Sequence, residues 1–170
     1  MREDAVGRTD FIASMAAFPT GVTVVTTLTE DGEPRGLTCN AFMSVSAEPP
    51  LVLVSLDATS NTLPALRSKR HFVVNFLAAG RESLALLFAT KEPGKFASVP
   101  FRPTDRGGLP VLHEDSIAHV VCEVVDETEA GDHVLFLGRV YEARKPEDGA
   151  VPLLYYRRAY DRWPGAPESD

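Results

Sequence analysis

The chain contains six or so short segments in which apolar and polar side chains alternate, and turn-forming residues separate several of them. Such alternation is typical of half-buried β-strands. The hairpin signals are Asp31-Gly32, between the first two segments, and "TEAGD", between the last two. Because the strand–helix–strand alternation of a parallel sheet is missing, the pattern predicts a mainly β fold, a closed antiparallel barrel. The predicted strands are two within residues 21–46, then 51–57, 71–78, 117–127 and 133–144.

Short helices are predicted between and before these strands. Phe11, Met15 and Phe18 recur at helical spacing behind a Thr/Asp cap, so we expect an amphipathic helix over residues 9–18 that packs on the core and ends at Pro19. The other predicted elements are helices at 60–69, behind the possible cap Ser60, and at 81–90, a long loop at 91–112, and a frayed tail after Trp163.

The length of 170 residues, with 44% hydrophobic residues, fits one globular domain. We expect a single domain over residues 1–170, with its core at about 10–162 and a flexible tail at 164–170. A net charge of −7 argues against a nucleic-acid partner. The clusters "RSKRH" and "YYRRAYDR" are basic exceptions, each either a solvated face or a local anion site.

The N-terminus is charged and lacks the apolar core of a signal peptide, and no apolar run approaches the ~20 residues that span a bilayer. Cys39 and Cys122 have neither CxxC nor metal-ligand spacing, which favours a reduced protein over a disulfide. We therefore expect a cytoplasmic protein without a membrane segment. The four histidines are scattered and predict no metal site.

The usual nucleotide and hydrolase motifs are absent from the sequence: GxGxxG, GxxxxGK[ST], GxSxG and HExxH. The unusual segment is "RGLTCNAFMSVSAEPPLVLVSL", residues 35–56, where five small polar side chains follow one another along a predicted strand. Each would cost about 1–3 kcal/mol if it were buried without a partner. Either these side chains face water, or the strand lines a cleft that binds a polar, flat ligand.

In order and spacing, this segment together with "FPTGVTVVTT", "FVVNFLA", "GDHVLFLGRV" and "PLLYYRRAY" resembles the short-chain flavin reductases that supply reduced flavin to two-component monooxygenases. The resemblance runs from about residue 10 to 162. It implies a six-stranded antiparallel Greek-key split barrel that binds FMN or FAD, has a few short flanking helices, and forms a homodimer with the flavin near the subunit interface.

The resemblance also implies the site residues. Thr38 to Ala41 would follow the isoalloxazine ring and ribityl chain, Ser44 to Ser46 would approach the flavin phosphate, and the donors at 60–62 would bind phosphate at a helix start. The implied flavin contacts are Thr38, Cys39, Asn40, Ala41, Ser44, Val45, Ser46, Ser55, Leu56, Ser60, Asn61, Thr62, Phe76, Phe96, Tyr156 and Tyr160. Cys39 is interpreted as a small apolar residue and not as a nucleophile.

Several of these roles have alternatives. Asn75 either borders the flavin pocket beside Phe76 or is a buried amide bonded to a neighbouring strand. The two tyrosines either close over the pocket or pack in a dimer. His133 matches the family histidine near the nicotinamide, while a histidine after a turn is otherwise a surface residue. The family often has a glycine after the arginine of "YYRRAY", and this chain has Arg158-Ala159, which places the approach of this segment to the flavin in doubt.

The implied activity is hydride transfer from NADH to flavin, with the reduced flavin leaving for a partner monooxygenase; the alternatives are a non-catalytic flavin-binding protein and a split-barrel oxidoreductase with another substrate. NADH is favoured over NADPH because no arginine pair suits a 2′-phosphate. FAD is favoured over FMN because Lys95, Phe96 and Phe101 of the 91–105 loop could contact an adenosine.

Overall fold

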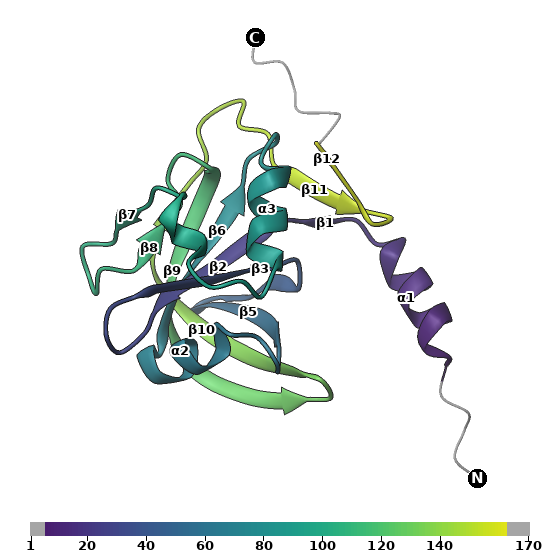
Figure 1. Ribbon diagram of the computed structural model, residues 1–170, viewed down its shortest axis with the longest axis horizontal. Helices are drawn as coiled ribbons and strands as arrows, with labels where there is room; N and C mark the ends of the chain where they lie inside the picture. Colours follow the sequence, from purple (N-terminus) through teal and green to yellow (C-terminus); the bar gives the residue numbers. More distant parts are fainter. Residues whose placement is uncertain (1–5, 163–170) are drawn as a thin grey trace.

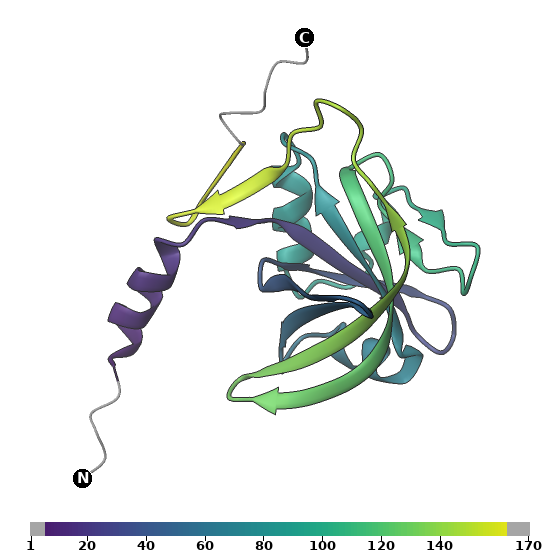
Figure 2. The same cartoon turned by 180° about the vertical axis from the view of Figure 1, so that it is seen from behind.

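A computed structural model describes residues 6–162, and the predicted tail at 164–170 lies outside them. Seven strands form an antiparallel sheet in the order β3-β2-β6-β9-β10-β5-β4. Figures 1 and 2 show this sheet curled upon itself, with β9 and β10 as a long projecting hairpin. The strands are β2 Thr23–Leu28, β3 Pro34–Cys39, β4 Phe42–Ala47, β5 Pro50–Asp57, β6 His71–Leu77, β9 Ser116–Ala130 and β10 His133–Arg144.

The two edges of the sheet are consecutive in the chain. β3 pairs with β2 and β4 pairs with β5, and only Asn40 and Ala41 lie between β3 and β4. The Ser55 N–H donates to the Ala41 carbonyl at 3.0 Å across this junction. The sheet therefore has to close, since one continuous segment forms both of its edges. The mainly β class is confirmed; the main sheet has seven strands instead of six because one predicted strand divides at Asn40.

Two smaller sheets add to the main one, and one of them lies in the segment that was expected to be a loop. β1 (Thr20–Gly21), β11 (Leu153–Tyr156) and β12 (Ala159–Arg162) form one of them. β7 (Arg102–Pro103) pairs with β8 (Pro110–Val111), behind the short 3₁₀ helix η1 (Lys95–Ala97). The prediction of one long loop at 91–112 is wrong in this respect, because two-residue strands are too short to show an alternating pattern.

The first helix does not pack on the body of its own chain. α1 (Arg8–Ala16) has no buried residue, and Phe11, Met15 and Phe18 are 53%, 54% and 70% exposed. In Figure 1 it extends away from the barrel. The expectation that these three side chains pack on the core is therefore wrong for the single chain.

The other two helices lie against the barrel. α2 (Leu63–Lys69) contacts β2 and β6, and α3 (Glu82–Ala89) contacts β3. α2 begins three residues after the predicted start because Ser60 forms a turn, in which its hydroxyl accepts a hydrogen bond from the Thr62 N–H at 3.2 Å. Within residues 6–162 no helix is both long and apolar enough to cross a membrane.

The barrel interior is apolar, with Phe72, Phe136 and Val54 fully buried. Asn75 on β6 is also fully buried, and its amide Nδ2 donates to the Val24 carbonyl at 3.0 Å. Its Oδ1 accepts from the Leu112 N–H at 2.9 Å. The two alternatives for Asn75 are thereby decided: its amide links strand β2 to the segment before β9.

The predicted "TEAGD" loop is a tighter turn than expected. β9 continues to Ala130 and β10 starts at His133, so Gly131 and Asp132 alone form the turn, with Gly131 at φ 64°. A left-handed residue of this kind is what a two-residue hairpin requires. His133 is consequently placed at the very tip of the hairpin.

The hairpin between β11 and β12 has an unusual turn. Its two central residues, Arg157 and Arg158, are both left-handed, at φ 50° and 65°. Turns of this type favour asparagine and glycine, because a Cβ is disfavoured there by about 1–2 kcal/mol per residue. The positions that suit glycine are thus 157 and 158. Ala159 already lies in β12, where the strand conformation does not require a glycine.

We expect Arg158→Gly to raise the free energy of unfolding by about 0.5–1 kcal/mol. The relief of the left-handed strain exceeds the larger unfolded-state entropy of glycine. Urea denaturation of the purified protein measures this difference. Arg158→Ala is the matched control: it removes the same side chain, keeps the Cβ, and should stay near wild type. An equal rise in the free energy of unfolding in both variants would show that the effect comes from removing the charge of Arg158.

Candidate functional site

A cavity of about 310 Å³ opens beside β3, between the loop that precedes α2 and the hairpin β11–β12. Its lining combines apolar and aromatic side chains with hydroxyl, amide and ammonium groups. Its lining residues are Val22, Leu37, Thr38, Asn40, Asp57, Ser60, Asn61, Thr62, Phe88, Ala89, Thr90, Lys91, Lys95, Tyr155 and Tyr160. We call this the first cavity.

The first cavity brings together six of the predicted site residues from three separate parts of the chain. They are Thr38, Asn40, Ser60, Asn61, Thr62 and Tyr160. Thr38 is fixed because its hydroxyl donates to the Ala85 carbonyl at 2.6 Å, which ties β3 to α3. Asn61 is fixed because its Nδ2 donates to the Lys91 carbonyl at 2.9 Å. The polar strand therefore does line a cleft, through its first half.

The remaining residues of the polar strand lie elsewhere. Ala41 and Ser55 line a neighbouring apolar groove of about 880 Å³, which the first cavity adjoins at Asn40. Ser44, Val45 and Ser46 lie on β4 beyond that junction and do not line the first cavity. Their part in phosphate binding stays a prediction.

Cys39 and Leu56 point into the barrel and not into the first cavity. Leu56 is fully buried, and the Cys39 Sγ lies 3.5 Å from the carbonyls of Ala41 and Ser55. Burial raises the pKa of the Cys39 thiol to about 11, so the thiol is protonated at neutral pH. Cys39 and Cys122 are both buried and free.

Three predicted aromatic contacts also lie outside the first cavity. Phe76 packs against Phe42, with ring centroids 5.2 Å apart. Tyr156 is 40% exposed and lies against the Arg157 guanidinium. Phe96 lines a second cavity on the other side of the loop that precedes α2. Tyr155, which was not among the predicted site residues, lines the first cavity beside Tyr160, in the place expected for Tyr156. Successive residues of a strand face opposite sides, so Tyr155 and Tyr156 cannot both face the cavity.

Two charged residues at the cavity were also missed. The Asp57 carboxylate accepts from the N–H and the hydroxyl of Thr59, at 2.6 and 2.5 Å, and these bonds lower the pKa of Asp57. The Lys91 ammonium donates to the same Thr59 hydroxyl at 2.7 Å. A charged residue at a strand end or in a loop has the sequence pattern of solvated surface, so no sequence signal distinguished these two.

His133 does not line the first cavity. It is paired with Asp57 across β5 and β10, and its Nδ1 is 2.7 Å from Asp132 Oδ1. The Ala58 N–H donates to the Asp132 carbonyl at 3.0 Å, which joins the hairpin tip to the loop before α2. His133 is thus next to one lining residue across the sheet, and its role toward a ligand stays a prediction.

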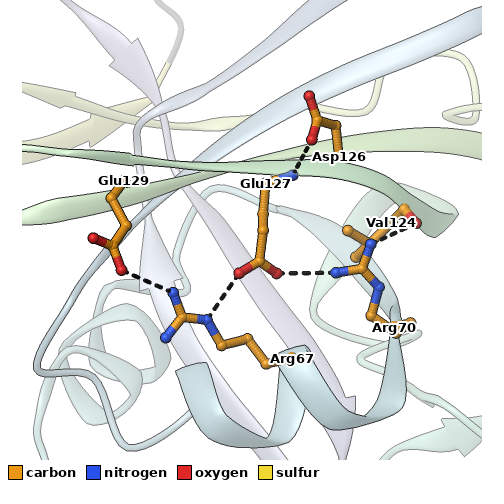
Figure 3. A network of polar contacts seen from close by, with 6 residues as sticks. All are labelled: Arg67, Arg70, Val124, Asp126, Glu127 and Glu129. Carbon is orange, nitrogen blue, oxygen red and sulfur yellow. Dashed lines mark hydrogen bonds and ion pairs between the residues drawn. The ribbon is translucent and has the colours of Figure 1, made fainter.

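The loop that supplies Ser60 to Thr62 is anchored from the far end of α2. Arg67 Nε and Arg70 Nη1 donate to the two carboxylate oxygens of Glu127 on β9, at 3.0 and 2.9 Å (Figure 3). Arg67 also pairs with Glu129 at 3.6 Å. Two arginines of the basic cluster "RSKRH", Arg67 and Arg70, are therefore paired with carboxylates of the same chain. These ion pairs link α2 to the projecting hairpin β9–β10.

The donor set of the first cavity suits a phosphorylated, flat, partly apolar ligand. Hydroxyl groups of residues 60 and 62 and the ammonium of Lys91 can bind phosphate oxygens. Leu37, Tyr155 and Tyr160 give apolar and aromatic surface for a ring. A flavin has both parts, so the residues present fit this group.

Comparison with known proteins agrees with this chemistry. Residues 15–164 match the family model described as flavin reductase like domain. The chain is 46% identical over 154 residues to flavin reductase (NADH) of Kitasatospora aureofaciens, covering 91% of this chain and 81% of that protein. It resembles the crystal structure of nitrilotriacetate monooxygenase component B from Mycobacterium thermoresistibile, with a TM-score of 0.86, 34% identity, and 95% and 91% of the two chains covered.

A further structural relative has been solved with ligands. The NADH:FAD oxidoreductase of Streptomyces globisporus C-1027, in complex with NAD and FAD fragments, matches with a TM-score of 0.85 and 33% identity. The match covers 99% of this chain and all of that one, 100%. The family match covers most of the sequence, and the relatives agree with it in sequence and in fold. The chain therefore belongs to the flavin reductase like domain family.

Proposed function

We propose that this chain is a flavin reductase that oxidises NADH and transfers the hydride to FAD or FMN. The observation that carries the proposal is the first cavity, which is lined both by phosphate-binding donors and by apolar and aromatic side chains, within a chain of this family. When bound, the flavin would supply the acceptor for the hydride of reduced nicotinamide. The residues of the chain bind, orient and shield the reactants.

The polar and the aromatic lining residues of the first cavity have separate roles in this proposal. Ser60, Thr62 and Lys91 hold the flavin phosphate, and Tyr155 with Tyr160 covers the ring. Thr38 and Asn40 lie along the polar edge of the flavin, as the sequence resemblance implied. His133 orients the nicotinamide carboxamide through a ring nitrogen.

We further propose that the reduced flavin leaves for a partner monooxygenase. The support is that a structural relative is named as component B of a monooxygenase. The exposed apolar face of α1 suggests a homodimer, because Phe11, Met15 and Phe18 remain uncovered in the single chain. Sedimentation velocity measures the mass of the protein in solution and so distinguishes a monomer from a dimer. A single reductase domain over residues 1–170, with its core at about 10–162, and a cytoplasmic location complete the proposal.

Loss of NADH absorbance on addition of the protein and free flavin tests the function. The alternatives predict other results: a non-catalytic flavin-binding protein would bind flavin and leave NADH unoxidised, and an oxidoreductase with another substrate would keep its flavin through desalting. Rapid NADH oxidation that depends on added flavin supports the proposal, and flavin binding without NADH oxidation contradicts it.

We expect His133→Ala to raise the KM for NADH about threefold to tenfold, with a smaller fall in kcat. One hydrogen bond of about 0.5–1.5 kcal/mol is lost on the nicotinamide side, while the flavin Kd stays within twofold of wild type. Steady-state kinetics with NADH varied at saturating flavin measure this. The matched control is His113→Ala, in the loop before β9, which should be silent. Unchanged kinetics in both variants would remove His133 from the site.

A further inference from the structure

The residue before His133 is a carboxylate that bonds directly to its ring. Asp132 Oδ1 lies 2.7 Å from His133 Nδ1. This hydrogen bond lowers the pKa of Asp132, so its carboxylate is ionised at neutral pH. An ionised carboxylate can only accept, so a neutral His133 ring that bonds to it carries its proton on Nδ1. The other ring nitrogen, Nε2, is then a hydrogen-bond acceptor.

The backbone around Asp132 is fixed by the fold. Gly131, at φ 64°, and Asp132 form the whole turn between β9 and β10. The Ala58 N–H donates to the Asp132 carbonyl at 3.0 Å, which ties this turn to the loop that precedes α2. The next residue, His133, is already paired with strand β5, opposite Asp57. The turn therefore presents the carboxylate and the imidazole side by side.

The other carboxylate near His133 has its own partners. Asp57 lies opposite His133 at the end of β5. Its carboxylate accepts from the N–H and the hydroxyl of Thr59, at 2.6 and 2.5 Å. Asp132 is therefore the carboxylate that decides which nitrogen of the His133 ring carries the proton.

The His133 side chain is on the outer side of the sheet, together with Asp57. Val134, the next residue, is buried in the barrel core, and successive strand residues face opposite sides. Directly opposite residues of an antiparallel pair have Cβ atoms about 4.5–5.5 Å apart. Because Asp57 lines the first cavity, a ligand that extends past Asp57 comes within reach of the His133 ring.

We propose that Asp132 is a positioning residue: it holds the ring proton of His133 on Nδ1, so that Nε2 accepts a hydrogen bond from the amide N–H of the nicotinamide. This inference rests on the proposed function, which places His133 beside the nicotinamide. It adds the direction of that hydrogen bond and the residue that sets it. A carboxamide has an acceptor oxygen and a donor nitrogen, and an Nε2 acceptor selects the donor. The carboxamide is thereby held in one of its two orientations.

Nitrogen-15 NMR of the histidine rings tests the tautomer in the protein without ligands, at about pH 8.5, where imidazoles are neutral. His133→Ala identifies the His133 signals. We expect the Nδ1–H form in wild type and in Asp132→Asn, whose amide oxygen still accepts, and a mixture of both forms in Asp132→Ala. The matched control is Asp105→Ala, an exposed aspartate between β7 and β8, which should leave the His133 signals unchanged.

Steady-state kinetics test the direction of the hydrogen bond with an NADH analogue. Reduced 3-acetylpyridine adenine dinucleotide has a methyl group in place of the amide nitrogen, so it keeps the carbonyl oxygen and lacks the donor. We expect His133→Ala to raise the KM for NADH about threefold to tenfold, and to leave the KM for the analogue within about twofold of wild type.

Asp132→Ala should raise the KM for NADH about twofold to fivefold, a moderate effect because water competes for an exposed pair. In the double variant Asp132→Ala/His133→Ala it should add nothing to His133→Ala, since Asp132 acts through His133. Asp132→Asn should restore most of the affinity for NADH that Asp132→Ala loses.

Several results would overturn the proposal. An Nε2–H form in wild type would show that Asp132 does not hold the proton on Nδ1. An equal effect of His133→Ala on NADH and on the analogue would show that the ring donates to the carbonyl oxygen. An unchanged KM for NADH in Asp132→Ala would remove Asp132 from the site. Absence of NADH oxidation in wild type would instead refute the reductase function, and the NMR result would still decide whether Asp132 sets the tautomer.

Discussion

Asn75→Ala is expected to lower the free energy of unfolding by about 3 kcal/mol or more. The amide of Asn75 makes three hydrogen bonds while fully buried, to the Val24 carbonyl, the Thr26 hydroxyl and the Leu112 N–H. Removing one partner leaves the buried groups without compensation, at a cost of about 1–3 kcal/mol for a single group. Guanidinium denaturation followed by circular dichroism measures this effect.

The matched control for this prediction is Asn40→Ala. Asn40 is exposed at the junction of β3 and β4, and its one side-chain bond, to the Thr20 hydroxyl, is long at 3.4 Å. An exposed substitution of this kind changes stability by about 0.5 kcal/mol or less. Similar losses in the two variants would show that the network around Asn75 adds little to stability.

The double variant Ser60→Ala/Thr62→Val is expected to raise the Kd for FMN about tenfold to a few hundredfold. Both hydroxyls line the first cavity. Each hydrogen bond to a charged phosphate is worth about 1.5–3 kcal/mol, and water replaces part of it. Quenching of FMN fluorescence on titration with protein measures the Kd, and the melting temperature without flavin checks the fold.

Ser44→Ala/Ser46→Ala is the matched double variant on the other half of the polar strand. Because these serines lie on β4 and outside the first cavity, wild-type affinity for FMN in this variant would place the phosphate in the first cavity alone. The sequence resemblance alone assigned both serine groups to phosphate, so the two variants separate the alternatives. Loss of affinity only in Ser44→Ala/Ser46→Ala would place the phosphate along β4.

The sequence by itself determined the fold class and the family. Period-two alternation and hairpin signals depend on neighbouring residues, and they are visible without knowing which strands pair. They correctly predicted β5, β6, β9 and β10, within a few residues at each end. The resemblance in the segment around Thr38 to Ala41 correctly indicated a flavin reductase. It also selected six residues that the fold brings into one cavity.

Only the tertiary structure decided how the polar strand is used. The strand divides at Asn40 because its two halves pair with different partners, so Thr38 faces the first cavity while Ser44 lies beyond it. Asp57 joins the site from the end of β5 and Lys91 from the loop after α3, and neither had a sequence signal that distinguished it from solvated surface. A sequence pattern reports which side of its own strand a residue takes, whereas a site depends on which distant segments meet there, and that is set by strand pairing and helix packing.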